Sequence, residues 1–301
     1  QPPPAPPPPA PTLPGSLPPF PPIDKGALPP PDPTPLGAAA GFPQSTFAAS
    51  PYGAVYLCNF NNIKSVIRLD LETPDWIKIQ RDSEIRILDL NNNHKSEKNI
   101  LYHDLEKGIL IRRFIEGNKF NLNKINSDQQ LELLGRAIKE IHKTNYEKDA
   151  INNFSNAINR YKEILKYKIQ KDPILEIGFE IYQDLNHESY PKVFSHNDLT
   201  QENIIWDHEY VFIDWEYAGL NNPLFDIASI ISSYSLNDQQ IDSLWRGYGK
   251  KSDVDDEILR KWIKFTYFCD YIWRICLIET SIYDEKFLNL DDLKKNLSIF
   301  L

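Results

Sequence analysis

The sequence predicts an α+β protein in which a part rich in β-strands is followed by a larger, mainly helical part. Branched and aromatic residues form short runs at 55–57 and 65–69, as is typical of strands. Further along, apolar residues recur with the spacing of an amphipathic helix at Leu131, Leu134, Ile138 and Ile141. A further helical stretch is expected at 262–280.

The first 51 residues differ abruptly in composition from the rest of the chain and hold most of its 24 prolines. Proline runs favour the extended polyproline II conformation and cannot build a packed core. We interpret residues 1–51 as a disordered or extended linker, with a ligand for SH3, WW or EVH1 domains as the alternative. The strand-rich part is then expected at 52–117 and the mainly helical part at 118–301.

Composition and charge limit the kinds of molecule that this protein is expected to bind. With 301 residues, 41% of them hydrophobic, the chain can build a substantial core. The net charge of −9 argues against nucleic acid and is compatible with a cationic small molecule. No apolar run reaches the length of a membrane span, no signal-peptide pattern is present, and three cysteines are too few for a disulfide framework. We therefore expect a cytoplasmic protein.

Residues 195–226 place two acids and an amide in the order that phosphoryl transfer requires. Asp198 can accept the proton of a substrate hydroxyl, whereas Asn203 and Asp214 can hold Mg²⁺ against the phosphates of ATP. The alternative is that these are ordinary turn residues, because Asp and Asn are common in turns. Turn chemistry does not require this order, so the catalytic interpretation is favoured.

The local pattern around these residues predicts a β-hairpin. An apolar run at 203–206 and a second one at 210–213 flank the polar segment 207–209. Two strands joined by a tight turn would bring Asn203 and Asp214 to neighbouring ends of one hairpin. Both side chains could then face the same ion.

The segment His196-Asn197-Asp198-Leu199 with Asn203, followed by Ile213-Asp214-Trp215-Glu216-Tyr217, resembles the choline/ethanolamine kinase family, and within it the bacterial LicA-like choline kinases. The resemblance extends over residues 55–295. It implies a two-lobed protein-kinase-like fold, in which the strand-rich part is the small lobe and the helical part the larger lobe. It also implies Mg·ATP-dependent phosphorylation of choline. The alternatives are an ethanolamine or aminoglycoside-type phosphotransferase and, from another class, a catalytically idle binding protein or a polyproline adaptor.

The resemblance also implies a nucleotide site. Arg68 would contact the phosphates and pair with Glu84, in a segment that resembles the family's helix start at Arg81, with Lys78 as the rival cation. The main chain near Phe114 and Ile115 would meet adenine. The Gly-rich turn that relatives place before the first strand is poorly matched here, and Gly53 is only a weak candidate for it.

For the substrate, the resemblance implies Tyr217 and Trp273 as aromatic faces and Glu216 or Asp270 as the acid near the ammonium group. A quaternary ammonium donates no hydrogen bond, so aromatic faces and carboxylates must bind it. The alternative for Trp273 is a core position on an apolar helix.

Two departures from the family pattern concern this pocket. Cys276 stands where relatives often have a second aromatic residue, and Ser232-Ser233 stand where an acid is common. Both departures keep ethanolamine open as the substrate. His196 and Asp226 are expected to support the catalytic loop and not to react.

Overall fold

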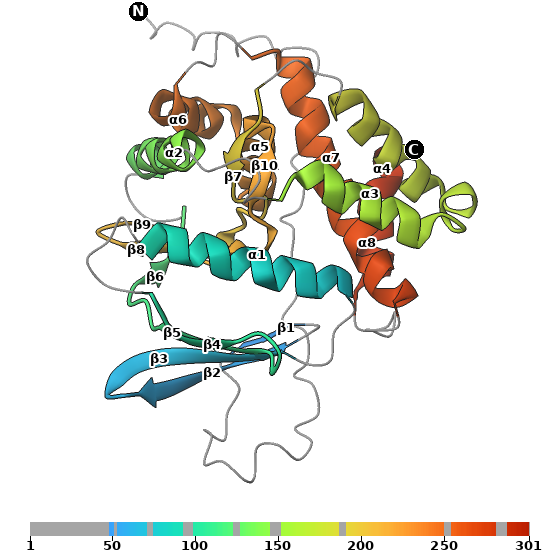
Figure 1. Ribbon diagram of the computed structural model, residues 1–301. Coiled ribbons are helices and arrows are strands. Elements are labelled where there is room, and N and C mark those ends of the chain that lie inside the picture. Colours follow the sequence, from blue (N-terminus) through green and yellow to red (C-terminus); the bar gives the residue numbers. More distant parts are fainter. Residues whose placement is uncertain are drawn as a thin grey trace, which may run out of the picture.

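The computed structural model describes residues 48–50, 53–70, 75–92, 99–122, 127–144, 152–186, 191–249, 254–280 and 288–300. Within these residues the chain forms a β-rich lobe and a larger helical lobe, with a long helix between them (Figure 1). The proline-rich part of the predicted linker, up to residue 47, lies outside the described residues.

The small lobe is a five-stranded antiparallel sheet. Its strand order is β1-β2-β3-β5-β4, formed by Ala48–Ser50, Gly53–Phe60, Ile63–Asp70, Ile109–Arg113 and Ile100–Asp104. The predicted strands at 55–57 and 65–69 are confirmed inside β2 and β3. The sheet begins at Ala48, within the segment assigned to the linker, because β1 pairs with β2. Its sequence, Ala-Ala-Ser, carries no strand signal of its own.

Helix α1 (Asp75–Asn92) lies along the sheet and separates it from the larger lobe (Figure 1). The helices of that lobe are α2 (Ser127–Lys143), α3 (Phe154–Leu165), α4 (Pro173–Asn186), α5 (Pro223–Ser233), α6 (Asp238–Tyr248), α7 (Asp256–Glu279) and α8 (Leu290–Leu297). The two predicted helices are confirmed as α2 and part of α7. Among the described helices, none is long and apolar enough to cross a membrane.

Two small sheets carry the motif segment. Strand β7 (Val193–Ser195) pairs with β10 (Gly219–Asn221). Strand β8 (Ile204–Asp207) pairs with β9 (Glu209–Phe212) and with β6 (Asn118–Lys119). Strand β6 thus belongs to this sheet and not to the five-stranded one. The division of the chain after residue 117 stays a prediction.

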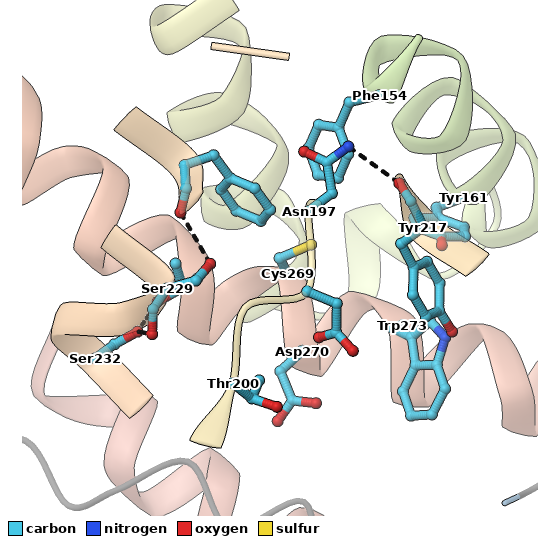
Figure 2. A pocket seen from close by; sticks show the side chains of 13 residues that line it. Phe154, Tyr161, Asn197, Thr200, Tyr217, Ser229, Ser232, Cys269, Asp270 and Trp273 are labelled. Carbon is cyan, nitrogen blue, oxygen red and sulfur yellow. Dashed lines mark hydrogen bonds between the residues drawn. The ribbon is translucent and has the colours of Figure 1, made fainter. Parts of the chain in front are cut away.

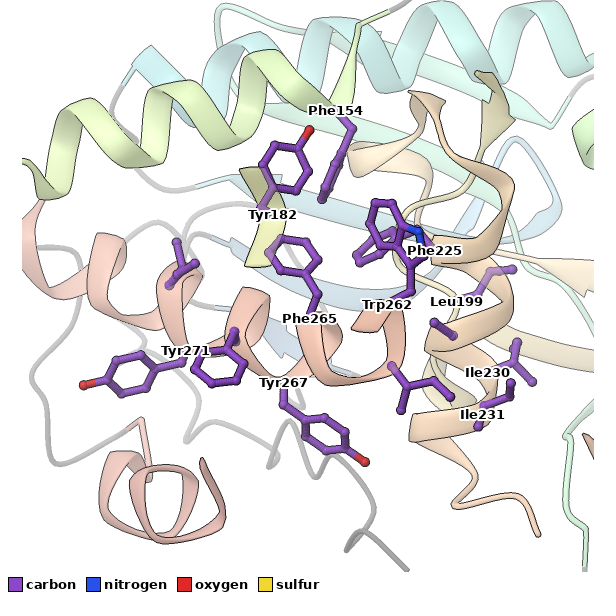
Figure 3. Close-up of a cluster of buried hydrophobic side chains, with 14 of the residues drawn as sticks. Phe154, Tyr182, Leu199, Phe225, Ile230, Ile231, Trp262, Phe265, Tyr267 and Tyr271 are labelled. Atoms are coloured by element: carbon purple, nitrogen blue, oxygen red, sulfur yellow. The ribbon is translucent and has the colours of Figure 1, made fainter. Parts of the chain in front are cut away.

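The main core surrounds α7. Phe225 on α5 packs edge-on against Trp262 and also contacts Phe265, and Tyr182 on α4 covers Phe265 from the other side (Figure 3). Trp262 and Phe265 are almost completely buried. Burying aromatic side chains of this size is the main stabilising contribution in such a lobe. It holds rigid the helix that presents Asp270 and Trp273.

A second apolar cluster joins α1 to the motif segment. Ile85 and Leu88 of α1 are buried in one cluster with Phe194 and Trp215. The rings of Phe194 and Trp215 stack with centroids 5.9 Å apart and planes 7° from parallel. The segment after Asp214 is therefore packed against the helix of the small lobe.

Helices α2 and α6 approach closely at a pair of glycines. A Cβ atom built on Gly247 would overlap the main-chain oxygen of Glu132, and one on Gly135 would overlap that of Leu244. Alanine is normally the better helix former by about 0.5–1 kcal/mol. Here we expect the reverse sign, because Gly247→Ala must push two packed helices apart.

We expect Gly247→Ala to lower the free energy of unfolding by about 1–3 kcal/mol, the usual effect of overpacking. Denaturant unfolding measures this. Asp242→Ala, at an exposed position of the same helix, is the control and should change stability by no more than about 0.5 kcal/mol. A Gly247→Ala protein as stable as the parent would show that the two helices separate freely.

Candidate active site

The predicted hairpin is present. Ile204 on β8 pairs with Phe212 on β9, and the main-chain N–H of Ile213 donates to the oxygen of Asn203 at 3.0 Å. The turn is tighter than predicted, because Glu209 belongs to β9 and His208 takes a left-handed φ of 57°. Asn203 and Asp214 therefore leave the hairpin at the same end.

Asp198 and Asn203 are in direct contact. The Nδ2 of Asn203 donates to the main-chain oxygen and to Oδ2 of Asp198, each at 2.9 Å. This contact uses the nitrogen of the amide, so its oxygen Oδ1 is the atom left for a metal ion. The carboxylate of Asp198 is held in place by the residue that would bind the metal.

Asp214 begins a tight turn with unusual backbone geometry. Its φ of 66° and ψ of 63° are left-handed, and the 3₁₀ turn η4 (Trp215–Tyr217) follows at once. Aspartate is one of the residues that adopts this conformation more readily than others. The turn points the chain from the hairpin toward α1.

The donor set fits magnesium bound together with a nucleotide. Among the described residues, no three His, Cys, Asp or Glu side chains gather into a group that could hold a metal ion by themselves. Mg²⁺ does not need such a group, since it is commonly held by one or two carboxylates, waters and substrate phosphates. Asp214 and the amide oxygen of Asn203 would supply hard oxygen atoms of that kind.

Asp226 supports the predicted catalytic loop, residues 196–200 around Asp198, from the start of α5. Its two carboxylate oxygens accept the main-chain N–H groups of His196 and Asn197, both at 2.8 Å. The ring of His142 approaches the same carboxylate at 3.0 Å and contacts the hydroxyl of Tyr248 at 2.8 Å. These contacts are those of a supporting residue and tie the loop to α2 and α6.

The ring of His196 supports the other end of the site. Its Nε2 lies 3.0 Å from the main-chain oxygen of Ile213, the residue before Asp214. Because a carbonyl only accepts, Nε2 is the donor. The ring thus joins the loop of Asp198 to the turn of Asp214, as a scaffold residue would.

On the side of the small lobe, the predicted pair between Arg68 and Glu84 is present. The Nη2 of Arg68 lies 2.8 Å from Oε2 of Glu84. Helix α1 starts at Asp75, six residues before the helix start suggested by the family pattern. The side chain of Lys78 lies outside the described residues.

Two further charged residues, Arg81 and Asp70, join the pair of Arg68 and Glu84, and the sequence analysis missed both as partners. Arg81 contacts Glu84, Asp70 and Glu216, and Asp70 also contacts Arg68 at 3.1 Å. The spacing Arg-x-x-Glu on a helix could have signalled Arg81 as a partner of Glu84. Nothing local connects Arg81 with Glu216, 135 residues away.

The carboxylates of this cluster have opposite pKa shifts. Burial disfavours the charge of Glu84, yet Arg68, Arg81 and Arg112 together lower its pKa to about 2. Burial raises the pKa of Glu216 to about 7, the nearby carboxylates of Asp214 and Glu84 add to the rise, and Arg81 and Arg68 act against it. Glu216 therefore depends on its arginine partners to stay ionised.

Phe114 and Ile115 follow β5 at the boundary of the lobes. The main-chain N–H of Phe114 donates to the oxygen of Lys64 at 2.9 Å, and the Lys64 ammonium lies 4.1 Å from the centre of the Phe114 ring. That N–H is therefore engaged within the protein. Close packing explains the glycine at position 53, because a Cβ atom there would lie 2.9 Å from the main-chain oxygen of Leu69.

A cavity of about 90 Å³ opens beside Asp198. Its lining residues come from α3, the catalytic loop, η4, α5 and α7: Phe154, Tyr161, Asn197, Asp198, Thr200, Tyr217, Phe225, Ser229, Ser232, Thr266, Cys269, Asp270 and Trp273. Figure 2 shows Ser229 and Ser232 on one side of Asp270 and the aromatic rings of Tyr161, Tyr217 and Trp273 on the other.

The structure brings three of the four predicted substrate residues to this cavity, and Glu216 is the exception. Tyr217, Asp270 and Trp273 line it, whereas Glu216 is buried against Arg81. The expectation that Glu216 could face the substrate is therefore corrected. In the turn η4, neighbouring side chains point to different sides, which separates Glu216 from Tyr217.

Asp270 already has a cationic partner. The Nε and Nη2 atoms of Arg274 lie 3.2 and 3.1 Å from its carboxylate, and Arg274 also donates to the main-chain oxygen of Leu288. Trp273 is half-buried and packs against the core as well as lining the cavity. Phe154 and Tyr161, which the sequence analysis missed, are brought in by α3.

The structure shows where the residues of the two departures from the family pattern lie. Cys276 is completely buried and belongs to the core. Ser233 does not line the cavity; its hydroxyl accepts the main-chain N–H of Gln201 at 2.9 Å and so supports the catalytic loop.

The sequence matches the profile of the phosphotransferase enzyme family over residues 77–262. It is 26% identical over 203 residues to the protein LicA of Haemophilus influenzae, which covers 63% of this chain and 74% of that protein. Plasmodium vivax ethanolamine kinase has a similar structure, with a TM-score of 0.67, 17% identity and coverage of 88% of this chain and 83% of that one.

The choline kinase LicA from Streptococcus pneumoniae is similar too, with a TM-score of 0.64, 17% identity and coverage of 81% of this chain and 90% of that one. These likenesses confirm the predicted protein-kinase-like fold, with its β-rich small lobe and mainly helical larger lobe.

Proposed function

Since this chain belongs to the phosphotransferase enzyme family, we propose that it transfers the γ-phosphoryl group of Mg·ATP to the hydroxyl group of choline. The observation that carries the proposal is the cavity in which Asp198 lies together with Tyr217 and Trp273. It places a proton acceptor beside aromatic faces, which is what a hydroxylated quaternary ammonium compound requires.

In this proposal Asp198 accepts the proton of the substrate hydroxyl as that oxygen attacks the γ-phosphorus, and the bond between the γ-phosphorus and the β–γ bridging oxygen breaks to release ADP. Its contact with Asn203 keeps the carboxylate oriented. Asn203 and Asp214 would hold Mg²⁺, which neutralises phosphate charge when it is bound. Arg68, oriented by Glu84, would contact the phosphates from the small lobe.

Choline is favoured by the walls of the cavity. Five aromatic side chains line it: Phe154, Tyr161, Tyr217, Phe225 and Trp273. Asp270 is paired with Arg274, so its attraction for a cation is reduced and the aromatic faces become the main binding contribution. A cavity of about 90 Å³ suits a small amino alcohol better than an aminoglycoside.

Ethanolamine is the second candidate, and the opposite wall of the cavity favours it. The hydroxyls of Ser229, Ser232 and Thr266 lie 2.9, 2.8 and 2.7 Å from main-chain oxygens of their own helices. A hydroxyl that donates to a protein oxygen offers only acceptor lone pairs to a ligand. The Thr266 hydroxyl also lies 3.0 Å from the Ser232 oxygen and can donate to it in place of its own helix, which uses one lone pair of Ser232. The N–H groups of ethanolamine could use these acceptors, whereas the methyl groups of choline could not.

Measuring ATP consumption with choline, ethanolamine and an aminoglycoside tests the proposal. We expect the highest kcat/KM for choline. Preference for ethanolamine would make ethanolamine the substrate in place of choline, and the proposed phosphoryl transfer would stand. ATP consumption with none of the three would support the alternative of a binding protein.

We expect Trp273→Ala to raise KM for choline about tenfold, since a cation–π contact contributes about 0.5–2 kcal/mol and a tenfold change corresponds to about 1.4 kcal/mol. KM for ATP should stay within twofold, because ATP would bind between the lobes. Steady-state kinetics with each substrate varied in turn measures both. Tyr167→Ala, which removes an aromatic ring that is 78% exposed, is the control. An unchanged KM for choline in Trp273→Ala would contradict the aromatic binding site.

A further inference from the structure

Arg81 connects three separate segments that meet at the boundary of the lobes. From α1 its guanidinium reaches Asp70 at the end of β3 at 3.1 Å and Glu84 on α1 at 3.5 Å. It also forms an ion pair with Glu216 in η4. Both Arg81 and Glu216 are about 95% buried, so this is not a surface contact.

Charged side chains are packed closely around Arg81. The guanidinium groups of Arg68, Arg81 and Arg112 act on the carboxylates of Asp70, Glu84 and Glu216, and the carboxylate of Asp214 acts on Arg112 and Glu216 as well. A buried charge without a partner is strongly destabilising. Removing Arg81 alone would take away the cation that pairs with Glu216, whereas removing Arg81 and Glu216 together would remove both charges of that pair.

Glu216 follows Asp214 by only two residues, and η4 is a single tight turn. Holding the side chain of Glu216 therefore fixes the direction in which the chain leaves Asp214. The ring of His196 fixes the main chain on the other side, through the oxygen of Ile213. Asp214 thus lies between two anchors, one from the larger lobe and one from α1.

We propose that Arg81 is a positioning residue: through Glu216 it sets Asp214 of the larger lobe in register with Arg68 of the small lobe, so that one Mg·ATP can contact both. This inference rests on the proposed function. It assigns Arg81 no contact with nucleotide or substrate. Removing a residue that holds a direct metal ligand in place typically changes the affinity for the metal ion by about 10–100-fold.

An arginine is required for this geometry. Its Nη1 faces Glu216 and Glu84 while its Nη2 faces Asp70, which uses the planar fork of the guanidinium. Lysine has a single ammonium group and cannot hold these positions at once. Arg81→Lys should therefore behave like the neutral variant in metal binding, although it keeps the charge.

The test uses four variants of the full chain: Arg81→Met, Glu216→Gln, the double variant and Arg81→Lys. Titration calorimetry with ATP, in the presence of Mg²⁺ and of a chelator, gives the gain in affinity that Mg²⁺ produces. Thermal unfolding without nucleotide gives the stability. Arg86→Ala is the matched control, because Arg86 lies on the same helix in an exposed pair with Asp82.

We expect Arg81→Met to reduce the gain in ATP affinity from Mg²⁺ about tenfold and to lower the melting temperature. Coulomb attraction alone predicts the opposite change in metal binding, since the variant is more negative near Asp214. In the double variant the melting temperature should recover and the gain from Mg²⁺ should not. The control should match the parent in both measurements.

Two results would overturn the inference while leaving the proposed function intact. One is a gain from Mg²⁺ within twofold of the parent in Arg81→Met. The other is a double variant that recovers both the melting temperature and the gain in ATP affinity from Mg²⁺, which is what a purely structural role predicts. A parent protein whose ATP affinity does not depend on Mg²⁺ would overturn the proposed function and this inference together.

Discussion

Replacing Asp198 by asparagine is expected to lower kcat by about 10²–10⁴-fold, the usual contribution of a positioned proton acceptor. The amide cannot accept the proton of the substrate hydroxyl. It retains an oxygen that can still accept the Nδ2 of Asn203, so the loop should keep its conformation. Affinity for Mg·ATP should therefore remain close to that of the parent, and kinetics together with nucleotide titration measure both quantities.

A matched control for this variant is Asp172→Asn. Asp172 lies in the same lobe, accepts the hydroxyl of Tyr271 and caps α4, and asparagine caps helices equally well. The control should leave kcat unchanged. Turnover by Asp198→Asn within threefold of the parent would show that another group accepts the proton.

Loss of the Asp214 carboxylate is expected to remove productive binding of Mg·ATP, with kcat/KM for ATP reduced by at least about 10²-fold. Asn203→Ala should weaken binding less, because an amide contributes a dipole to the ion and not a full charge. Titration of Mg²⁺ under assay conditions compares the concentrations at half-maximal activity.

The left-handed backbone of Asp214 calls for two substitutions. Alanine in this conformation costs about 1–2 kcal/mol, so Asp214→Ala mixes strain with loss of charge. Asparagine tolerates the conformation, so Asp214→Asn isolates the charge. If Asp214→Asn required the same Mg²⁺ concentration as the parent, the metal ion would have to be bound elsewhere.

The sequence alone determined the parts of this protein that depend on neighbouring residues. The hairpin that brings Asn203 and Asp214 together follows from two strand-forming runs around a polar turn, within twelve residues. The helix α2 follows from its apolar spacing. Such features could be predicted because backbone hydrogen bonding and side-chain periodicity are local properties. The pair of Arg68 with Glu84 is not local, and only the resemblance to a known family predicted it.

Only the tertiary structure decided which side chains share a space. Tyr217 and Glu216 are adjacent in sequence, yet one lines the cavity and the other pairs with Arg81 on α1. Phe154 and Tyr161 reach the cavity because α3 packs beside it, and β1 forms because an unremarkable Ala-Ala-Ser segment meets the edge of β2. The physical reason is that packing and buried charge pairing join residues far apart in the chain, where the sequence carries no local signal of their contact.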